Sequence, residues 1–416
     1  MTTVRDRERR RLKYAATLNE ESLPEAVDLD YELLYIDIGN VDSMGQIHNI
    51  AQYRFEDAPS RARRKVKHGD VIISTVRTYL QAIAPIDDPP DNLIVSTGFA
   101  VIRPRIDILN TDYCKYALRE PRFIYEVEAR STGVSYPAIN ASDLGDIRVE
   151  VPTLPTQQRI ADYLDRETAQ IDILIKEKER MISLLAEKRA ALISLAVIRG
   201  LNPDAPLMPS GHAWIGDIPA HWKVKRAKQI LRERDERSET GDEELLTVSH
   251  ITGVTKRSEK EVYMFEAETT KGYKLCSPEN LVINTLWAWM GAMGIAWQTG
   301  IVSPAYHVYE LSSELIPGYV DALVRTSVFA KEVTRFSKGV WSSRLRLYPE
   351  GLYEVYLPVP PPEEQQQIIE FIANERQQST DMEDALKKSI ELLKERRSAL
   401  ITAAVTGQIK PETMNS

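Results

Sequence analysis

A tandem repeat spans the chain and limits most strongly how it can fold. The segment Val151-Pro-Thr-Leu-Pro-Thr-Gln-Gln-Arg-Ile160 returns as Val359-Pro-Pro-Pro-Glu-Glu-Gln-Gln-Gln-Ile368. Likewise, Leu185-Ala-Glu-Lys-Arg-Ala-Ala-Leu-Ile193 returns as Leu393-Lys-Glu-Arg-Arg-Ser-Ala-Leu-Ile401. Both pairs lie 208 positions apart, which is half of the 416 residues. A self-similarity of this kind outranks single motifs as a guide to architecture. The chain is therefore predicted to be a duplication, each half having a variable block followed by a helical block.

The helical blocks carry an apolar heptad pattern. The seam positions are predicted to be Ile160, Leu164, Ile171, Leu174, Leu185 and Leu192 in the first copy, and Ile368, Ile372, Leu386, Leu393 and Leu400 in the second. A period of 3.5 residues is typical of a left-handed coiled coil. Gly200 and Gly407 are stop signals for helices of about 43 residues, or roughly 65 Å each. A helix of that length with one apolar stripe needs a partner, and the duplicate in the same chain, packed antiparallel, is the simplest one.

The variable blocks, at about 1–150 and 213–358, contain short β-branched or aromatic runs bounded by turn residues. The runs predicted as strands begin at Leu33, Val71, Phe99, Leu245, Leu281 and Tyr306. Helices are predicted over 111–118 and 318–329, so each block is expected to be α+β. The fold class is thus two α+β domains separated by two long antiparallel helices, with a pseudo-two-fold repeat. The Pro- and Gly-rich connector at 201–222 is expected to pack down through Trp214, Ile215, Ile218 and Trp222.

Composition narrows the environment and the class of partner. The net charge is −8, so any binding to nucleic acid must use local basic patches on an acidic body. The two cysteines are far apart, and no run approaches the ~18 apolar residues of a membrane span. The N-terminus runs straight into charge rather than into an apolar signal core. A reducing cytosol is therefore the expected location, with Arg5–Lys13 expected as a frayed arm or a helix face.

Catalytic motifs are missing from the sequence. Asp88-Pro-Pro-Asp91 resembles a methyltransferase motif but has an acid where that motif places an aromatic residue, so a turn is predicted. No phosphate-binding loop, nucleophile elbow or metal-ligand spacing among the six histidines is present. No catalytic and no metal site is predicted.

Basic and aromatic loops remain as candidate DNA contacts. The densest cationic run is Arg61-Ala-Arg-Arg-Lys-Val-Lys-His68, and a second segment combines Gly, Trp, hydroxyls and arginines at 338–346. Arg can read guanine, whereas Ser and Lys can contact phosphate. The segments at 75–79 and 285–289 occupy equivalent places after paired strands, although the two tryptophans in the second fit a core equally well. The candidate DNA-binding residues are Arg61, Arg63, Arg64, Lys65, Lys67, Arg77, Tyr79, Ser135, Tyr136, Lys256, Arg257, Trp287, Lys338, Trp341, Ser342, Ser343, Arg344 and Arg346.

The layout and the repeated motifs resemble the specificity subunit of type I restriction-modification systems. The resemblance rests on Pro-x-x-x-x-Gln-Gln-x-Ile at the start of each helical block, on Glu-[Lys/Arg]-Arg-x-Ala-Leu-Ile near its end, and on Gly211-His-Ala-Trp-Ile-Gly-Asp-Ile-Pro-Ala-His-Trp222. The glutamines involved are Gln157, Gln158, Gln365 and Gln366. Thr156 stands where an acid is usual in the family.

The resemblance implies that residues 1–152 and 201–360 each contain a target-recognition domain for one half of a gapped DNA target. It implies that 153–200 and 361–416 form helical spacers, whose seam residues and glutamine pairs also bind partners. Two methyltransferase subunits would supply S-adenosylmethionine, and restriction subunits would supply ATP and Mg, with no cofactor on this chain. Two alternatives stay open: a coiled-coil scaffold without a DNA role, and a fused restriction enzyme with its own catalysis.

Overall fold

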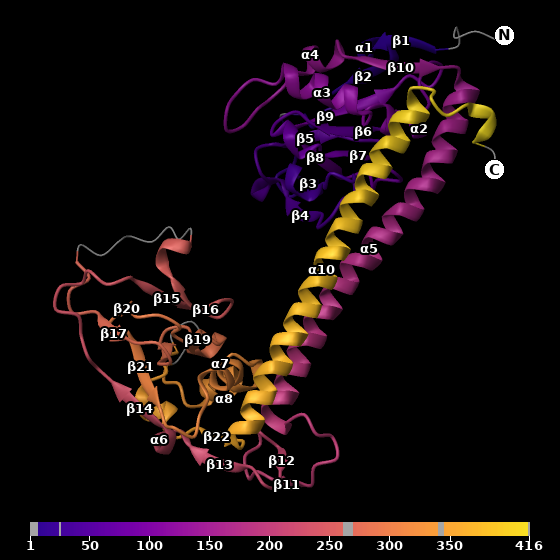
Figure 1. Cartoon of the computed structure of the whole chain (residues 1–416). Helices are drawn as coiled ribbons and strands as arrows, with labels where there is room; N and C mark the ends of the chain where they lie inside the picture. The colour runs from indigo at the N-terminus through magenta and orange to yellow at the C-terminus, as the bar shows by residue number, and fades with distance from the viewer. Residues whose placement is uncertain (1–6, 25, 261–268, 340–344, 415–416) are drawn as a thin grey trace. The chain divides into compact units, whose positions relative to one another are not determined.

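The chain folds into two compact units that share both long helices. The computed structural model describes residues 7–24, 26–260, 269–339 and 345–414. Unit 1 consists of Met1–Lys178 and Lys387–Ser416, and unit 2 of Glu179–Leu386. Helix α5 (Leu154–Arg199) and helix α10 (Pro362–Val405) each contribute one part to either unit (Figure 1). The two long helices predicted from the heptads are confirmed.

Unit 1 combines two four-stranded sheets with short helices. One sheet has the order β2 (Ala16–Leu18), β9 (Phe99–Pro104), β6 (Val71–Ser74), β7 (Ile83–Pro85). The other has the order β4 (Ala51–Arg54), β3 (Glu32–Ile36), β8 (Leu93–Ser96), β5 (Ala62–Lys65). Strand β1 (Arg7–Arg11) pairs antiparallel with β10 (Arg148–Pro152), directly before α5. The helices are α1 (Leu12–Ala15), α2 (Thr111–Ala117), α3 (Pro121–Arg130) and α4 (Ala141–Gly145).

Unit 2 repeats the first of these sheets. Its order is β14 (Leu231–Arg234), β21 (Tyr306–Leu311), β18 (Leu281–Asn284), β19 (Met293–Ile295). Strand β13 (Lys223–Arg226) pairs with β22 (Tyr356–Val359) directly before α10, as β1 pairs with β10 before α5. Three two-stranded antiparallel sheets complete it: β11 (Leu207–Pro209) with β12 (Asp217–Pro219), β15 (Leu246–Ser249) with β16 (Gly253–Lys256), and β17 (Lys274–Cys276) with β20 (Gly300–Val302). Its helices are α6 (Ala227–Ile230), α7 (Pro317–Val324), α8 (Ser327–Arg335) and α9 (Pro349–Leu352).

Most local predictions are confirmed, and two are wrong. The six predicted strand runs are strands, and 111–118 is helical. The single helix predicted over 318–329 is two helices, because Thr326 leaves the helical conformation and its side chain caps α8 by accepting from the N–H of Phe329. The described part of the N-terminal run is not a frayed arm or a single helix face, since Leu12 and Lys13 begin the short helix α1 and Arg7–Arg11 is strand β1. Its pairing with residues 148–152 is a long-range contact that local sequence does not report.

The two long helices pack antiparallel within each unit. In unit 1, Leu164 shares a core with Ile401, and Arg397 donates two hydrogen bonds to Asp172 at 2.9 and 3.3 Å. In unit 2, Val197 shares a core with Ile368. As the number of the α5 residue rises, that of its α10 neighbour falls, so the predicted antiparallel pairing is confirmed in both units.

The predicted seam needs one correction. Leu174 is 49% exposed, whereas its neighbour Ile175 is 5% exposed and buried. The step from the buried Leu164 to the next buried position, Thr168, is four residues rather than three. Because an α-helix has 3.6 residues per turn, seam positions alternate in steps of four and three residues, and either step can come first. The sequence pattern took the three-residue step after Leu164, so it placed a later seam position at Leu174 instead of at Ile175. The other predicted seam residues are buried or partly buried.

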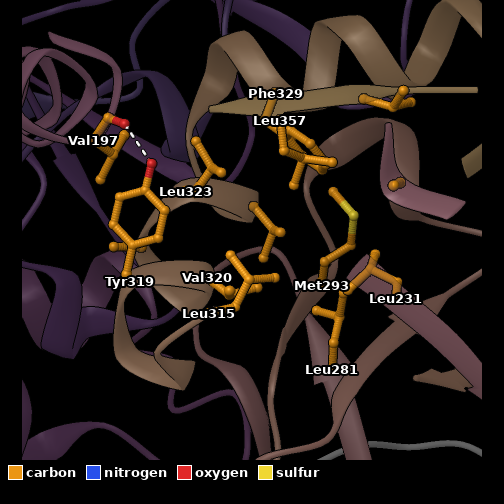
Figure 2. Packing of buried hydrophobic residues seen from close by; sticks show 14 of the residues in the cluster. Val197, Leu231, Leu281, Met293, Leu315, Tyr319, Val320, Leu323, Phe329 and Leu357 are labelled. Carbon is orange, nitrogen blue, oxygen red and sulfur yellow. Dashed lines mark hydrogen bonds between the residues drawn. The ribbon is translucent and has the colours of Figure 1, made fainter. Parts of the chain in front are cut away.

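In each unit a buried tyrosine anchors the backbone at the end of a long helix or on the strand before one. In unit 2, the Tyr319 hydroxyl on α7 donates to the carbonyl of Val197 on α5 at 2.8 Å, amid Leu323 and Phe329 (Figure 2). In unit 1, the Tyr113 hydroxyl on α2 donates to the carbonyl of Glu150 on β10 at 3.0 Å. The connector also packs down as predicted, with Ile215, Ile218 and Trp222 buried in the unit 2 core and Trp214 partly buried against it. Within the described part of the chain, no helix is long and apolar enough to cross a membrane.

Candidate nucleic-acid interface

Two loops meet in unit 1 and bring four of the predicted contact residues together. The loop after β6 holds Arg77 and Tyr79, and the loop after α3 holds Ser135 and Tyr136. The N–H of Arg77 donates to the carbonyl of Pro137 at 2.7 Å, and the guanidinium of Arg77 lies 4.9 Å from the ring centroid of Tyr136. All four side chains are exposed. We name this pair of loops (75–81 and 131–138) the unit 1 loop pair.

The backbone of the unit 1 loop pair is held tightly despite its exposure. Arg77 has a φ of 53°, a left-handed conformation that costs a non-glycine residue about 1 kcal/mol or more. Main-chain hydrogen bonds compensate, since the N–H of Ile139 donates to the carbonyl of Thr75 at 2.9 Å and Thr132 and Ala138 form a bridge. Such strained residues cluster at functional sites.

A turn between β8 and β9 joins the unit 1 loop pair to the basic run. The N–H of Thr97 donates to the carbonyl of Arg61 at 2.8 Å, and the carbonyl of Gly98 accepts from the N–H of Thr75 at 2.8 Å. A Cβ on Gly98 would lie 2.6 Å from Cδ1 of Ile38 and 3.1 Å from Cγ2 of Val76, so a larger residue would require these side chains to shift. This turn was not predicted, although Ser96-Thr-Gly98 between two strand-like runs was its signal.

The five cations of the basic run do not act as one patch. Arg61 and Lys65 are exposed and partly exposed, respectively, whereas Lys67 pairs with Glu21 and the guanidinium of Arg63 stacks 4.7 Å from the ring of Phe55. Arg64 is partly buried, and burial lowers the pKa of its guanidinium. The structure therefore leaves Arg61 and Lys65 as the cations of this run most available to phosphate.

Unit 2 builds an equivalent pair of loops with different side chains. The N–H of Leu347 donates to the carbonyl of Thr285 at 3.2 Å, matching the bond from Ile139 to Thr75. Lys338 and Arg346 exchange two main-chain hydrogen bonds of 2.9 Å, as Thr132 and Ala138 do in unit 1. The equivalence of the segments at 75–79 and 285–289 is thus confirmed. We name the described residues 285–291, 337–339 and 345–347 the unit 2 loop pair.

Aromatic side chains dominate the unit 2 loop pair. Trp287 is 50% exposed, and its ring stacks on that of Trp289 with centroids 6.1 Å apart. Trp289 is partly buried, and its indole N–H donates to the carbonyl of Leu286 at 3.1 Å. Trp287 therefore presents a face to solvent while Trp289 supports it. The predicted contacts Trp341, Ser342, Ser343 and Arg344 lie outside the described residues.

Lys256 is the last residue of strand β16, and Arg257 follows it. Both are partly buried. Burial raises the pKa of Tyr306, and the charge of Arg257 opposes that shift. The Tyr306 hydroxyl accepts a hydrogen bond from Asn284 at 3.0 Å, at the end of the strand that leads to Trp287. No hydrogen bond among the described residues joins Lys256 or Arg257 directly to the unit 2 loop pair.

The repeated glutamines have a structural role that corrects their predicted use by partners. Gln157 and Gln365 are 0% exposed. The amide of Gln157 accepts from the N–H of Asn110 at 2.7 Å and donates to the carbonyls of Ile108 and Pro152 at 2.9 and 2.7 Å. Gln365 repeats this with Ile316, Glu314 and Pro360 at 2.7, 2.7 and 2.9 Å. A side chain with no exposed surface cannot bind a partner, so these two residues clamp each long helix to its own unit, and only Gln158 and Gln366 are exposed.

One segment of the chain matches a known domain. Residues 56–182 match the model of the type I restriction modification DNA specificity domain. The matched segment includes the basic run and the unit 1 loop pair.

Relatives and solved structures extend the match beyond that segment. The chain is 28% identical to the type I restriction enzyme HindI specificity subunit of Haemophilus influenzae over 111 aligned residues. This alignment covers 26% of this chain and 24% of that protein. It is 21% identical over 397 residues to the putative MjaX specificity subunit of Methanocaldococcus jannaschii, covering 90% and 85% of the two. The resemblance to type I specificity subunits is confirmed.

The fold agrees with this family. An HsdS subunit from Thermoanaerobacter tengcongensis superposes with a TM-score of 0.52 at 19% identity, over 98% of this chain and 99% of that one. A chain from a study of complex assembly and conformational transition of the type I R-M system superposes with a TM-score of 0.66 at 20% identity, over 97% and 99%. Identities this low establish a shared fold only, and function has to be argued from the site.

Proposed function

We propose that this chain is the DNA-recognition subunit of a type I restriction-modification complex and that each unit reads one half of a bipartite, gapped target. The proposal rests on the equivalence of the unit 1 loop pair and the unit 2 loop pair. Matching main-chain hydrogen bonds hold both, but their side chains differ. A shared scaffold with different loop chemistry suits the recognition of two different half-sites. Exposed Arg and Tyr in unit 1 and exposed Trp in unit 2 supply the hydrogen bonding and stacking that base and backbone recognition require.

Partner subunits would supply the catalysis. We expect methyltransferase subunits, two per chain, to bring S-adenosylmethionine, and restriction subunits to bring ATP and Mg. Exposed apolar side chains along the long helices are candidate partner contacts, because an interface there would remove them from water. Among them are Ile173, Leu174 and Leu392 in unit 1, and Met181, Leu184, Leu195 and Met382 in unit 2. In this proposal the antiparallel helices set the unspecified gap between the half-sites.

Co-expression with a type I methyltransferase subunit, followed by methylome sequencing, tests the proposal. The expected result is a stable complex and a gapped, adenine-methylated motif. The variant Leu184→Asp should weaken the complex, whereas Lys176→Asp, an exposed polar position on the same helix, should not. A complex that binds DNA without sequence preference would contradict the recognition role, and methyl transfer by this chain alone would favour a fused enzyme.

A further inference from the structure

A cavity of about 510 Å³ in unit 2 gathers three arginines. Arg189 comes from α5, Arg325 follows α7, and Arg376 comes from α10. His250, Thr326, Ser327 and Thr380 add further polar groups to the lining. The volume lies in the range of about 300–1,000 Å³ that small-ligand sites occupy.

The charge in this cavity is poorly compensated. Arg325 lies 3.5 Å from Asp321 and donates to the carbonyl of Ile251 at 2.7 Å, but its Nε is buried without a hydrogen-bond partner. Among the residues that the structure describes, neither Arg189 nor Arg376 forms an ion pair with a carboxylate. Partial removal from water, followed by the charges of Arg325 and Arg189, lowers the pKa of Arg376, and Asp321 opposes this shift. Three cations thus face one carboxylate.

The duplication supplies an internal control for this arrangement. Arg189 corresponds to Arg397 in unit 1 through the 208-residue repeat. Arg325 corresponds to Arg119, because each lies six residues after the buried tyrosine of its unit, Tyr319 or Tyr113. There, Arg397 forms its two hydrogen bonds with Asp172, whose counterpart in unit 2 is Thr380. The acid Asp172, which pairs with Arg397 in unit 1, is therefore replaced in unit 2 by the neutral hydroxyl of Thr380.

Two further exchanges open the space in unit 2. Tyr116 fills the unit 1 position, where its buried hydroxyl donates to Asp165 at 2.5 Å and lies 3.2 Å from the hydroxyl of Thr168. The counterpart of Tyr116 is Ala322, which lines the cavity, and the counterpart of Thr168 is Arg376. Unit 1 thus has a tyrosine and the ion pair of Arg397 with Asp172 where unit 2 has an open space lined by three arginines, although the Nε of Arg119, like that of Arg325, is buried without a partner. Arg189 and Arg325 are partly buried and Arg376 is exposed, so an anion in this open hollow would offset a local excess of positive charge.

We propose that this cavity binds a phosphate group through Arg189, Arg325 and Arg376. Guanidinium groups bind phosphate through paired, charge-assisted hydrogen bonds, and three of them around one space suit a group with several oxygens. The phosphate comes either from the backbone of bound DNA or from a free phosphate compound. The DNA source rests on the proposed function, whereas the phosphate site does not.

Calorimetry on the full chain with inorganic phosphate and with adenosine monophosphate tests the site. Arg376→Thr, which restores the unit 1 residue, should weaken binding by roughly tenfold, the loss expected for one charge-assisted contact. Thr380→Asp should weaken it at least as much by neutralising Arg189, while the melting temperature stays the same or rises because an ion pair forms. Arg180→Gln, which removes an exposed charge two and a half turns from Arg189, on the opposite face of the same helix, should change neither value.

Titration of a short duplex of arbitrary sequence at several salt concentrations separates the two sources. A DNA source predicts that Thr380→Asp lowers duplex affinity and reduces the slope of affinity against salt by about one, with Arg180→Gln showing a smaller loss. A free compound predicts that phosphate binding responds to the variants but duplex binding does not. If the chain binds phosphate and no duplex, the site stands and the proposed function fails. If neither phosphate nor duplex binding distinguishes Thr380→Asp from Arg180→Gln, the phosphate site is wrong.

Discussion

Units 1 and 2 share much of their fold but differ in the side chains on their surfaces. Both have a four-stranded sheet of equivalent order, an antiparallel strand pair leading into a long helix, and a buried glutamine that makes three main-chain hydrogen bonds. They differ in the loop pairs, where Arg77 and Tyr136 in one unit stand against Trp287 in the other. Backbone clamps have stayed alike because any loss leaves buried polar groups unpaired, whereas an exposed loop residue can change without this cost.

The units also differ where the long helices pass each other. Arg397 in unit 1 is paired with Asp172, whereas its counterpart in unit 2, Arg189, lines an open cavity. A difference inside an otherwise repeated framework is more informative than a cationic patch alone, because the other copy shows that the fold does not require it.

The largest expected effect tests what the units share. Gln157→Leu and Gln365→Leu should each lower the free energy of unfolding of their own unit by about 3–5 kcal/mol, because three main-chain groups lose their buried partner. Hydrogen exchange of the amides in each unit measures this. The exposed neighbours provide controls, and Gln158→Leu and Gln366→Leu should stay within about 0.5 kcal/mol. Unequal losses in the two units would break the equivalence of the clamps.

The second prediction tests an asymmetry. Asp172→Leu leaves the buried Arg397 without its counter-charge and should cost about 3 kcal/mol, whereas Thr380→Val in the other copy should cost less than about 0.5 kcal/mol. Urea denaturation measures both. Adding Arg397→Met to Asp172→Leu should recover most of the loss. A failure to recover would mean that Asp172 stabilises unit 1 by packing rather than by charge.

Loop chemistry should separate the half-sites. In the assembled complex, Arg77→Ala should weaken binding roughly tenfold through one half-site, and Trp287→Ala by a similar factor through the other. Fluorescence anisotropy with targets altered in either half measures this, and Tyr14→Ala serves as an exposed aromatic control outside the loop pairs. If each variant weakens both halves equally, the loop pairs contact the DNA backbone rather than the bases.

The smallest effect is expected at the base of the unit 2 loop pair. Arg346→Ala should relax only the second half-site, by about fivefold, because this residue is partly buried and its main chain already belongs to the bridge with Lys338. Lys338→Ala is the comparison, since an exposed lysine at a phosphate should weaken all sequences alike and reduce the salt slope. Selection of bound sequences from a randomised second half-site distinguishes these outcomes. A uniform loss for Arg346→Ala would reassign it to phosphate.

Sequence reasoning reached the loop pairs through the likeness of 75–79 to 285–289, because both follow runs of β-branched residues that form strands. It assigned Gln157 and Gln365 to partner binding, because a repeated polar residue does not reveal whether its amide is buried. It grouped all cations of the basic run, although the pairing of Lys67 with Glu21 joins residues 46 positions apart. The arginine cavity was missed altogether, because its three residues come from three separated segments.

The sequence by itself determined the duplication, the two long helices, six of the strands and the family resemblance. These follow from local pattern: the period of apolar residues selects helix or strand, and the repeat needs only comparison of the chain with itself. Tertiary structure alone decided that β1 pairs with β10, that Ile175 rather than Leu174 is buried, and that the glutamines are clamps. It also decided that Arg189, Arg325 and Arg376 meet in one cavity. Each of these depends on which distant backbone or side chain comes within hydrogen-bonding or packing distance, and periodicity along one segment carries no information about that.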